Sequence, residues 1–370
     1  MMILWLAVIC YSLPLFLLII IGRRILFSKL RTTSHSKKQA LNLTELTVIV
    51  PLRNEEVNIK RLVSCIEQST RLPYEIIFVD DHSTDNSYQY LNEFIKGRSS
   101  FKMIQLGAHH LGKKHAVRSG ILEAKTEFVL MLDADVVFDT DFFENLSTLK
   151  KHDLIILPVK MFHKKWYQHF FIIDVYIANA VNEGISGLLR PVMASGANLV
   201  CHRGKFLSWD SQRNFDFLGG DDLHILKDFR NNNGVVAIEI DSKFSVLTEA
   251  PDTFKAFFSQ RLRWSKNAMH VRDHLSSFLV MLQLFFTFSI FIFLCYFLVN
   301  SYVKEAVLLG SFKILFDLLL FYSFFKNKNQ LLTLSLLPIY ELVFPIYILI
   351  LCFGVLFINP FWKNRKVQPS

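Results

Sequence analysis

The sequence predicts an α/β fold with a doubly wound, mostly parallel sheet, flanked by transmembrane helices. Short apolar segments alternate with helical patterns through the middle of the 370-residue chain, an order typical of βαβ units. Long apolar runs lie at both ends, and hydrophobic residues make up 52% of the sequence. Two apolar segments end in acidic residues, which places carboxylates at the sheet edge where ligands bind in such folds.

Five segments have the apolar character of buried strands. They are Thr47–Leu52, Glu75–Asp80, Lys102–Leu106, Phe128–Asp133 and Asp153–Pro158. Helical patterns separate them, at Glu55–Gln68, Asp85–Lys96, Lys114–Ala124 and Asp141–Lys150. Strands covered by helices on both faces are almost continuously apolar, so this order predicts one central sheet between two helical layers.

Four apolar runs are long enough to cross a bilayer, which takes about 20 residues. They cover residues 3–21, 277–299, 306–325 and 331–358. The first run has no basic residue before it and no small-residue cleavage site after it, so we expect a retained anchor. Arg23 and Arg24 follow it, and positive charge stays cytoplasmic. We therefore expect the N-terminus outside and the central part of the chain in the cytoplasm.

The charge balance has two consequences. Four spans place the basic C-terminal tail outside, against the same rule, so the side of the tail stays open. The formal net charge of +9 is typical of proteins that bind nucleic acid. Here the basic residues gather beside apolar runs, so anionic lipid explains them better, and we expect no nucleic-acid partner.

Neither cysteine nor histidine predicts a metal centre. The five cysteines follow no disulfide or zinc pattern. Three histidines lie close together, His109, His110 and His115, but adjacent residues on a loop lack the i, i+4 spacing of a helical metal site. We therefore interpret them as surface histidines.

These patterns divide the chain into six segments. We expect a transmembrane anchor at 1–22, a basic linker at 23–44, an α/β domain at 45–252, an amphipathic interfacial segment at 253–276, a transmembrane region of about three segments at 277–360 and a basic tail at 361–370. The plan is that of an integral protein of the bacterial cytoplasmic membrane, with its α/β domain in the cytoplasm.

The strongest chemical signal is the apolar run that ends in Asp133-Ala134-Asp135. Side chains alternate along an extended chain, so both carboxylates point to one side if strand geometry persists. Two oxygen ligands on one side suit Mg²⁺ or Mn²⁺ holding a diphosphate. Such a short pattern is common by chance and gains weight only from other segments.

A second acidic pair, Asp80 and Asp81, closes the preceding predicted strand. Ser83, Thr84 or Asp85 can cap the helix that follows, but capping does not explain two adjacent carboxylates at a strand end. A carboxylate in that position accepts hydrogen bonds from a nucleobase or a ribose.

Three later segments each allow a structural and a chemical interpretation. Gly112–Ala116 begins a helix as an anion site or as a solvated basic turn. Gly219–His224 supplies a general base at a flexible edge, or carries acids that cap a helix. Phe254–Arg272 suits a membrane surface, which explains its charge but not the grouping of residues within Gln260–Trp264.

Taken together, these motifs resemble the signature of membrane-bound family 2 glycosyltransferases, which is D, D-x-D, D and Q-x-x-R-W. The matching segments are Val79-Asp80-Asp81, Asp133-Ala134-Asp135, Gly220-Asp221-Asp222 and Gln260-Arg261-Leu262-Arg263-Trp264. The family includes cellulose, chitin and hyaluronan synthases and ceramide glucosyltransferases. The resemblance implies a GT-A fold and inverting transfer of a hexosyl or N-acetylhexosaminyl group. The implied donor is a nucleotide diphosphate sugar of the UDP type, and the acceptor is a membrane-associated lipid or polysaccharide.

The resemblance also implies roles for individual residues. Asp81 matches the uracil-contacting acid, with Asp80 beside it. Asp135 matches the principal ligand of Mg²⁺ or Mn²⁺, and Asp133 matches the donor-contacting acid and a second ligand. The other donor-side matches are Pro51, Arg53, Glu55, Lys113, Gln260, Arg263 and Trp264.

On the acceptor side, Asp222 matches the catalytic base, and Asp221 is its neighbour. The acceptor-side loop is matched by Ser195, Gly196 and Asn198. A base removes the proton of an acceptor hydroxyl as its oxygen attacks the anomeric carbon, while metal and cationic residues stabilise the departing diphosphate.

Three alternatives stay open. Polymer synthases usually have more spans after the catalytic domain, so a channel requires a partner subunit or an oligomer. Transfer of one sugar to a lipid-linked acceptor is therefore supported at least as well as processive synthesis. A non-catalytic membrane scaffold that keeps a nucleotide-sugar-like site is the second alternative. A transporter is the third, because Asp317 and Glu341 lie within apolar runs.

Overall fold

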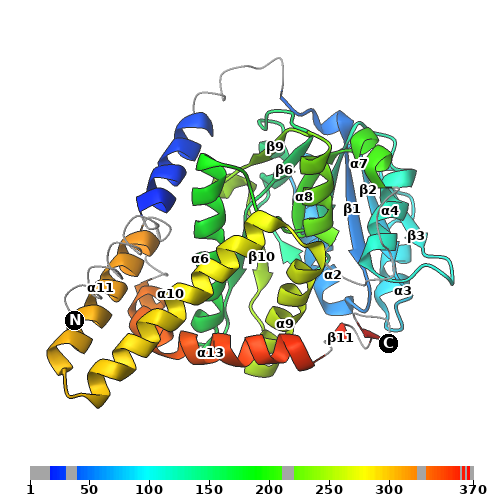
Figure 1. Cartoon of the computed structure of the whole chain (residues 1–370). Coiled ribbons are helices and arrows are strands. Elements are labelled where there is room, and N and C mark those ends of the chain that lie inside the picture. Colours follow the sequence, from blue (N-terminus) through cyan, green and yellow to red (C-terminus); the bar gives the residue numbers. More distant parts are fainter. Residues whose placement is uncertain are drawn as a thin grey trace. The chain divides into compact units, whose positions relative to one another are not determined.

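The structure is a computed structural model that describes residues 17–30, 40–210, 221–322, 331–358, 361–362 and 365–366. Two compact units make up the chain (Figure 1). The sheet unit comprises Lys29–Phe162, Met193–Glu249 and Asn359–Ser370. The helical unit comprises Met1–Ser28, His163–Val192 and Ala250–Ile358.

In the described part of the sheet unit, seven strands form one sheet in the order β3-β2-β1-β4-β8-β6-β9. Their bounds are β1 (Leu46–Leu52), β2 (Glu75–Asp80), β3 (Phe101–Gln105), β4 (Phe128–Leu132), β6 (Leu154–Ile156), β8 (Asn198–His202) and β9 (Val236–Ile238). All neighbours pair in parallel except β8, which runs antiparallel to β4 and β6. The predicted mostly parallel sheet is confirmed, and β8 is a strand that the sequence pattern did not reveal.

A second, three-stranded sheet has the order β5-β10-β7. It consists of β5 (Val136–Val137), β7 (Val159–Phe162) and β10 (Val246–Glu249). β5 follows Asp135 directly, and Thr248 of β10 lies opposite Val136 in an antiparallel register. This pairing places β10 beside the Asp133-Ala134-Asp135 motif.

The helices of the sheet unit agree with their predicted positions, except for α7, which the sequence pattern did not predict. They are α2 (Glu56–Glu67), α3 (Ser87–Phe94), α4 (Lys113–Glu123), α5 (Phe142–Leu146), α7 (Arg203–Trp209) and α8 (Asp221–Asn231), with the 3-10 helices η2 (Leu43–Glu45) and η4 (Ser242–Phe244) and the strands β11 (Phe361–Trp362) and β12 (Arg365–Lys366). α5 ends at Leu146, earlier than expected. α4 packs closely on β1, because a Cβ atom at Gly120 would lie 2.5 Å from the Ile49 side chain.

The helical unit contains α6 (Gln168–Leu188), α9 (Phe254–Val271), α10 (His274–Val299), α11 (Val303–Tyr322), α12 (Leu331–Ser335) and α13 (Leu337–Phe357). A helical segment over residues 17–30 packs against α6 backbone to backbone. A Cβ atom at Gly187 would lie 1.7 Å from the Gly22 carbonyl oxygen, and Arg23 pairs with Glu183 at 2.8 Å. The segment that contains α6 therefore groups with the helical unit, although we expected it within the α/β domain.

Among the described residues, α10 and α13 are long and apolar enough to cross a membrane. α11 is also a long helix, but it carries Lys313 and Asp317. These two side chains pair with each other, and Lys313 also pairs with Glu341 of α13 at 2.8 Å. The expectations for residues 1–16, for the linker at 31–39 and for most of the C-terminal tail lie outside the described residues.

Glu75, at the start of β2, is almost fully buried in the sheet unit. It accepts hydrogen bonds from the Thr47 hydroxyl and the Lys125 amide, both at 3.0 Å, and pairs with Lys102 at 2.9 Å. Burial raises the pKa of the Glu75 carboxyl, but these donors outweigh burial, and the net pKa lies below the usual 4.5. The ionised form thus stabilises the fold above about pH 4.5, and this stabilisation is lost as pH falls through the lowered pKa.

We therefore expect Glu75→Gln to lower the free energy of unfolding by about 2 kcal/mol at pH 7. The difference from wild type should shrink as pH falls below 4.5 towards the lowered pKa of Glu75. Urea titrations at pH 7 and pH 3.5 measure it. An equal difference at both pH values would show that the charge of Glu75 contributes nothing.

Candidate active site

The carboxyl ends of β1, β2 and β4 lie side by side at one edge of the sheet. Leu52 of β1 lies opposite Asp80 of β2, and Ile49 lies opposite Met131 of β4. The chain therefore leaves the sheet at three neighbouring points, each followed by a predicted site residue: Arg53, Asp81 and Asp133.

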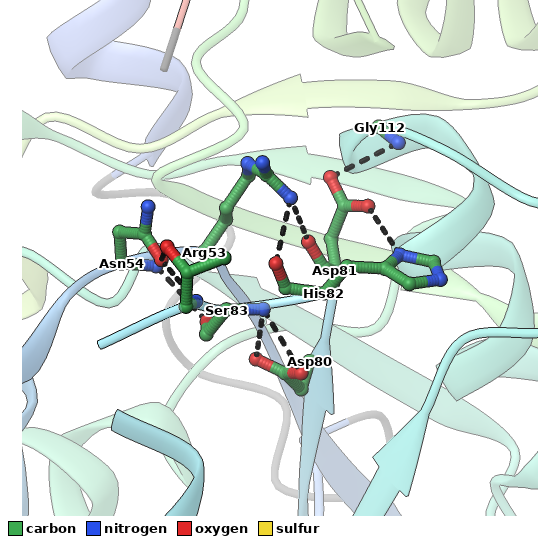
Figure 2. A network of polar contacts seen from close by, with 8 residues as sticks. Arg53, Asn54, Asp80, Asp81, His82, Ser83 and Gly112 are labelled. Carbon is green, nitrogen blue, oxygen red and sulfur yellow. Dashed lines mark hydrogen bonds and ion pairs between the residues drawn. The ribbon is translucent and has the colours of Figure 1, made fainter. Parts of the chain in front are cut away.

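The loops after β1 and β2 are tied together (Figure 2). The Arg53 guanidinium donates to the carbonyl oxygens of Asp81 and His82, at 2.6 and 2.8 Å. The Asn54 amide donates to the Ser83 hydroxyl at 3.0 Å, and the Thr84 amide donates to the Asn54 side chain at 2.7 Å. Ser83 and Thr84 therefore join the two loops and do not cap α3.

Asp85 precedes Asn86, the N-cap residue of α3, and its carboxylate accepts the Ser87 amide at 3.0 Å, so it contacts the start of the helix without being its N-cap. Asp80 is fully buried and accepts the Ser83 amide at 3.2 Å, so it holds its own loop. Pro51 lies within β1 and is buried.

Asp81 connects β2 to the start of α4. Its side chain is 2% exposed, one oxygen accepts the Gly112 amide at 3.0 Å, and the other lies 3.2 Å from Nδ1 of His82 (Figure 2). Gly112 precedes α4 with a φ of 93°, a conformation that favours glycine. Among the neighbouring histidines, His109 and His110 are exposed as expected, whereas His115 is half-buried and stacks on His110 at 4.8 Å.

Four site residues from distant segments meet at this edge. Lys113 pairs with Asp133 at 2.5 Å. The Gly196 amide donates to the Asp222 carboxylate at 3.2 Å, and a Cβ atom at Gly196 would lie 3.2 Å from the Lys113 ammonium nitrogen. The start of α4, the end of β4, the loop before β8 and the start of α8 thus form one cluster.

Asp135 lies in a turn between β4 and β5, so the extended geometry assumed from the sequence does not persist beyond Leu132. Burial and the charges of Asp133 and Glu55 together raise the pKa of the Asp135 carboxyl to about 6, against the opposing charge of Lys113. The Thr248 hydroxyl approaches Asp135 at 3.4 Å. In the described chain, no three His, Cys, Asp or Glu side chains come close enough to hold a metal ion by themselves.

Asp222 accepts the Leu223 amide at 2.8 Å as well as the Gly196 amide. Burial raises the pKa of its carboxyl, while Lys113 and the two amides oppose the rise. The predictions for Gly219, Gly220 and the side chain of Asp221 lie outside the described residues, although Asp221 begins α8.

The loop before β8 divides into exposed and buried members. Ser195 is half-buried, and its hydroxyl accepts the Ala197 amide at 3.4 Å. Asn198 is fully buried, and its side chain donates to the carbonyl oxygens of Pro158 and Phe244 at 3.0 and 2.9 Å. In this structure Asn198 therefore holds β8 to two neighbouring segments, and Gly196 is the loop residue that contacts Asp222.

The predicted motif residues Gln260, Arg263 and Trp264 lie on α9 of the helical unit. Arg261, which the sequence analysis did not select, contacts Gln260 and Trp264. Its guanidinium donates to the Gln260 side chain at 3.0 Å and lies 4.3 Å from the centre of the Trp264 ring. It is 5% exposed and pairs with Asp174 of α6. The i+3 spacing of Trp264 was the signal that marked this contact in the sequence.

We expect Arg261→Leu to lower the free energy of unfolding by about 3–5 kcal/mol, because it leaves the Asp174 carboxylate without its cation. The double variant Arg261→Leu, Asp174→Leu should recover part of the loss. Thermal melts of the purified protein measure both. Lys255→Leu, at an exposed position of α9, is the control and should change little. Losses that simply add in the double variant would contradict the coupling.

Residues 47–165 match the family model described as glycosyl transferase family 2. This segment of the chain is therefore similar to family 2 glycosyltransferases. It is 30% identical over 117 residues to a poly-beta-1,6-N-acetyl-D-glucosamine synthase of Staphylococcus epidermidis, covering 31% of this chain and 28% of that one. It is 29% identical over 134 residues to a dolichyl-phosphate beta-glucosyltransferase of Dictyostelium discoideum, covering 32% and 41%. The chain thus spans less than half the length of these curated relatives.

Among solved structures, the chain resembles the mannosyltransferase PcManGT from Pyrobaculum calidifontis, determined in complex with GDP-Man and Mn²⁺. The TM-score is 0.56 at 17% identity, over 90% of this chain and 99% of that chain. The likeness confirms the predicted GT-A fold.

Proposed function

We propose that the protein is an inverting glycosyltransferase that moves a hexosyl or N-acetylhexosaminyl group from a UDP-sugar to a membrane-associated lipid or polysaccharide acceptor. The observation that carries the proposal is the cluster of Lys113, Asp133, Gly196 and Asp222 at the sheet edge. In this cluster Lys113 is a cation that can bind a diphosphate, and Asp133 is an acid that can contact the donor. Asp222 is a carboxylate that can accept a proton from the acceptor.

The nucleoside of the donor binds at the loops after β1 and β2. Asp81 accepts from the base, supported by Asp80, while Pro51, Arg53 and Glu55 border the nucleoside. Arg53 fixes the position of Asp81 through its main chain. Lys113 and Asp133 contact the diphosphate and the sugar. The family resemblance assigns donor-binding roles to Gln260, Arg263 and Trp264 as well.

Asp135 and Asp133 hold a divalent cation, Mg²⁺ or Mn²⁺. Burial and the charges of Asp133 and Glu55 raise the pKa of Asp135, and the group of carboxylates suits a cation. A metal bound there neutralises the charge of the leaving diphosphate.

Asp222 is the catalytic base, with Asp221 beside it. Burial raises the pKa of the Asp222 carboxyl against the opposing effect of Lys113 and two backbone amides, and a raised pKa makes the carboxylate a stronger base. Ser195 and Gly196 form the acceptor-side loop and Asn198 anchors it. The acceptor oxygen loses its proton to Asp222 and bonds to the anomeric carbon as the bond to the diphosphate breaks, so one base suffices.

The helices α10 and α13 support an acceptor held at a membrane. We place the protein in the bacterial cytoplasmic membrane with the glycosyltransferase domain in the cytoplasm. Processive synthesis would require a partner subunit or an oligomer to complete a channel, whereas transfer to a lipid-linked acceptor would not.

The test is a screen of purified protein in nanodiscs that contain bacterial lipid extract. UDP-glucose, UDP-N-acetylglucosamine and GDP-mannose are each supplied with Mn²⁺, and nucleotide release and lipid-linked product are measured. We expect release with a UDP-sugar and none from Asp222→Asn. Equal release by wild type and variant would contradict the proposal, and nucleotide binding without any turnover would favour a non-catalytic scaffold.

A further inference from the structure

His82 has a backbone conformation that the fold does not favour. Its φ is 57°, in the left-handed region where residues other than glycine are uncommon. It stands between Asp81 and Ser83, in the loop that leaves β2 at the sheet edge. Backbone strain of this kind gathers at ligand sites, and an observed case is a reason to look for a function.

The side chain of His82 adds a second local cost. Its Nδ1 lies 3.2 Å from one Asp81 oxygen, but its Nε2 is buried without a hydrogen-bond partner among the described residues. A buried polar atom left unpaired destabilises the folded state. The ring as a whole is 31% exposed, so part of it is open to a ligand.

The fold does not require the imidazole. The Arg53 guanidinium binds the carbonyl oxygen of residue 82, and Asp80 binds the Ser83 amide. Both contacts use the main chain and would persist with glycine at position 82. What glycine would lose is the contact to the Asp81 carboxylate, whose other oxygen accepts the Gly112 amide.

We propose that His82 is a specificity-determining residue of the donor site. Its Nδ1 holds the Asp81 carboxylate in one orientation, and its exposed ring surface contacts the nucleobase that Asp81 binds. In the view of Figure 2, the imidazole and Gly112 lie on one side of that carboxylate, and Arg53 lies on the other. The inference rests on the proposed function, because it assumes that a nucleotide binds at Asp81.

The experiment replaces His82 with glycine and measures stability and nucleotide binding separately. His82→Gly removes the left-handed strain and the unpaired nitrogen, so the melting temperature should rise by about 2–4 °C. The dissociation constant for UDP, measured by calorimetry with Mn²⁺, should increase about tenfold, and the preference for UDP over GDP should change. A variant with a higher melting temperature and a weaker affinity for UDP would indicate that His82 contributes to binding at the expense of stability.

Two further variants sharpen the result. His82→Asn tolerates the left-handed region and keeps a side-chain donor for Asp81, so its UDP affinity should lie between those of wild type and His82→Gly. Asn233→Gly changes another left-handed residue, with a φ of 58°, in the turn after α8. It should leave UDP affinity unchanged.

A lower melting temperature for His82→Gly would show a structural role and overturn the inference. UDP affinity within about twofold of wild type would overturn it as well. If wild-type protein binds neither UDP nor GDP, the proposed function fails too, which separates the two conclusions.

Discussion

Asp135→Asn should reduce sugar transfer about 100-fold or more while the protein remains folded. The carboxylate is the predicted principal metal ligand, and an amide provides neither its charge nor its second anionic oxygen. Burial and the charges of Asp133 and Glu55 raise the pKa of Asp135 to about 6, so the carboxylate, which is ionised at pH 7.5, destabilises the metal-free fold. Removing that charge should leave the melting temperature equal to wild type or higher.

Transfer assays across a range of Mn²⁺ concentrations, with melting curves on the same samples, check this prediction. Thr248→Val is the control, because Thr248 approaches the Asp135 carboxylate at 3.4 Å without being a predicted ligand. It should keep most activity. Turnover of Asp135→Asn within about threefold of wild type would remove Asp135 from the metal site.

Asp222→Asn should abolish transfer and preserve nucleotide binding. The Gly196 and Leu223 amides hold the Asp222 carboxylate near Lys113, on the acceptor side of the cluster. An asparagine of the same shape cannot accept the acceptor proton, so the loss should reach about 1000-fold. Affinity for UDP and Mn²⁺ should stay close to wild type, because the base contacts the acceptor and not the donor.

Calorimetry beside a transfer assay separates these outcomes. Asp221→Asn is the matched control at the adjacent position and should do less damage. If Asp222→Asn loses UDP affinity as Asp135→Asn does, or if Asp221→Asn is the inactive variant, then Asp222 is not the base.

The sequence by itself determined the parallel half of the sheet. β1, β2 and β4 are continuous apolar runs that end in polar residues, and this pattern depends only on local order along the chain. It therefore also located Asp81, Asp133 and Asp135 at one sheet edge, and the family resemblance followed from their order.

Only the tertiary structure decided which distant residues meet. β8 enters the sheet between β4 and β6, and this antiparallel strand brings Gly196 to Asp222 and Lys113. Arg261 forms an ion pair with Asp174, which lies on a helix far away in the sequence. The periodicity of a segment indicates whether it is buried or exposed. It does not indicate which distant segment packs against it, because that depends on the path of the chain in three dimensions. The left-handed conformation of His82 could not be predicted for a related reason. Its φ is set by the folded loop after β2 and not by the residue type.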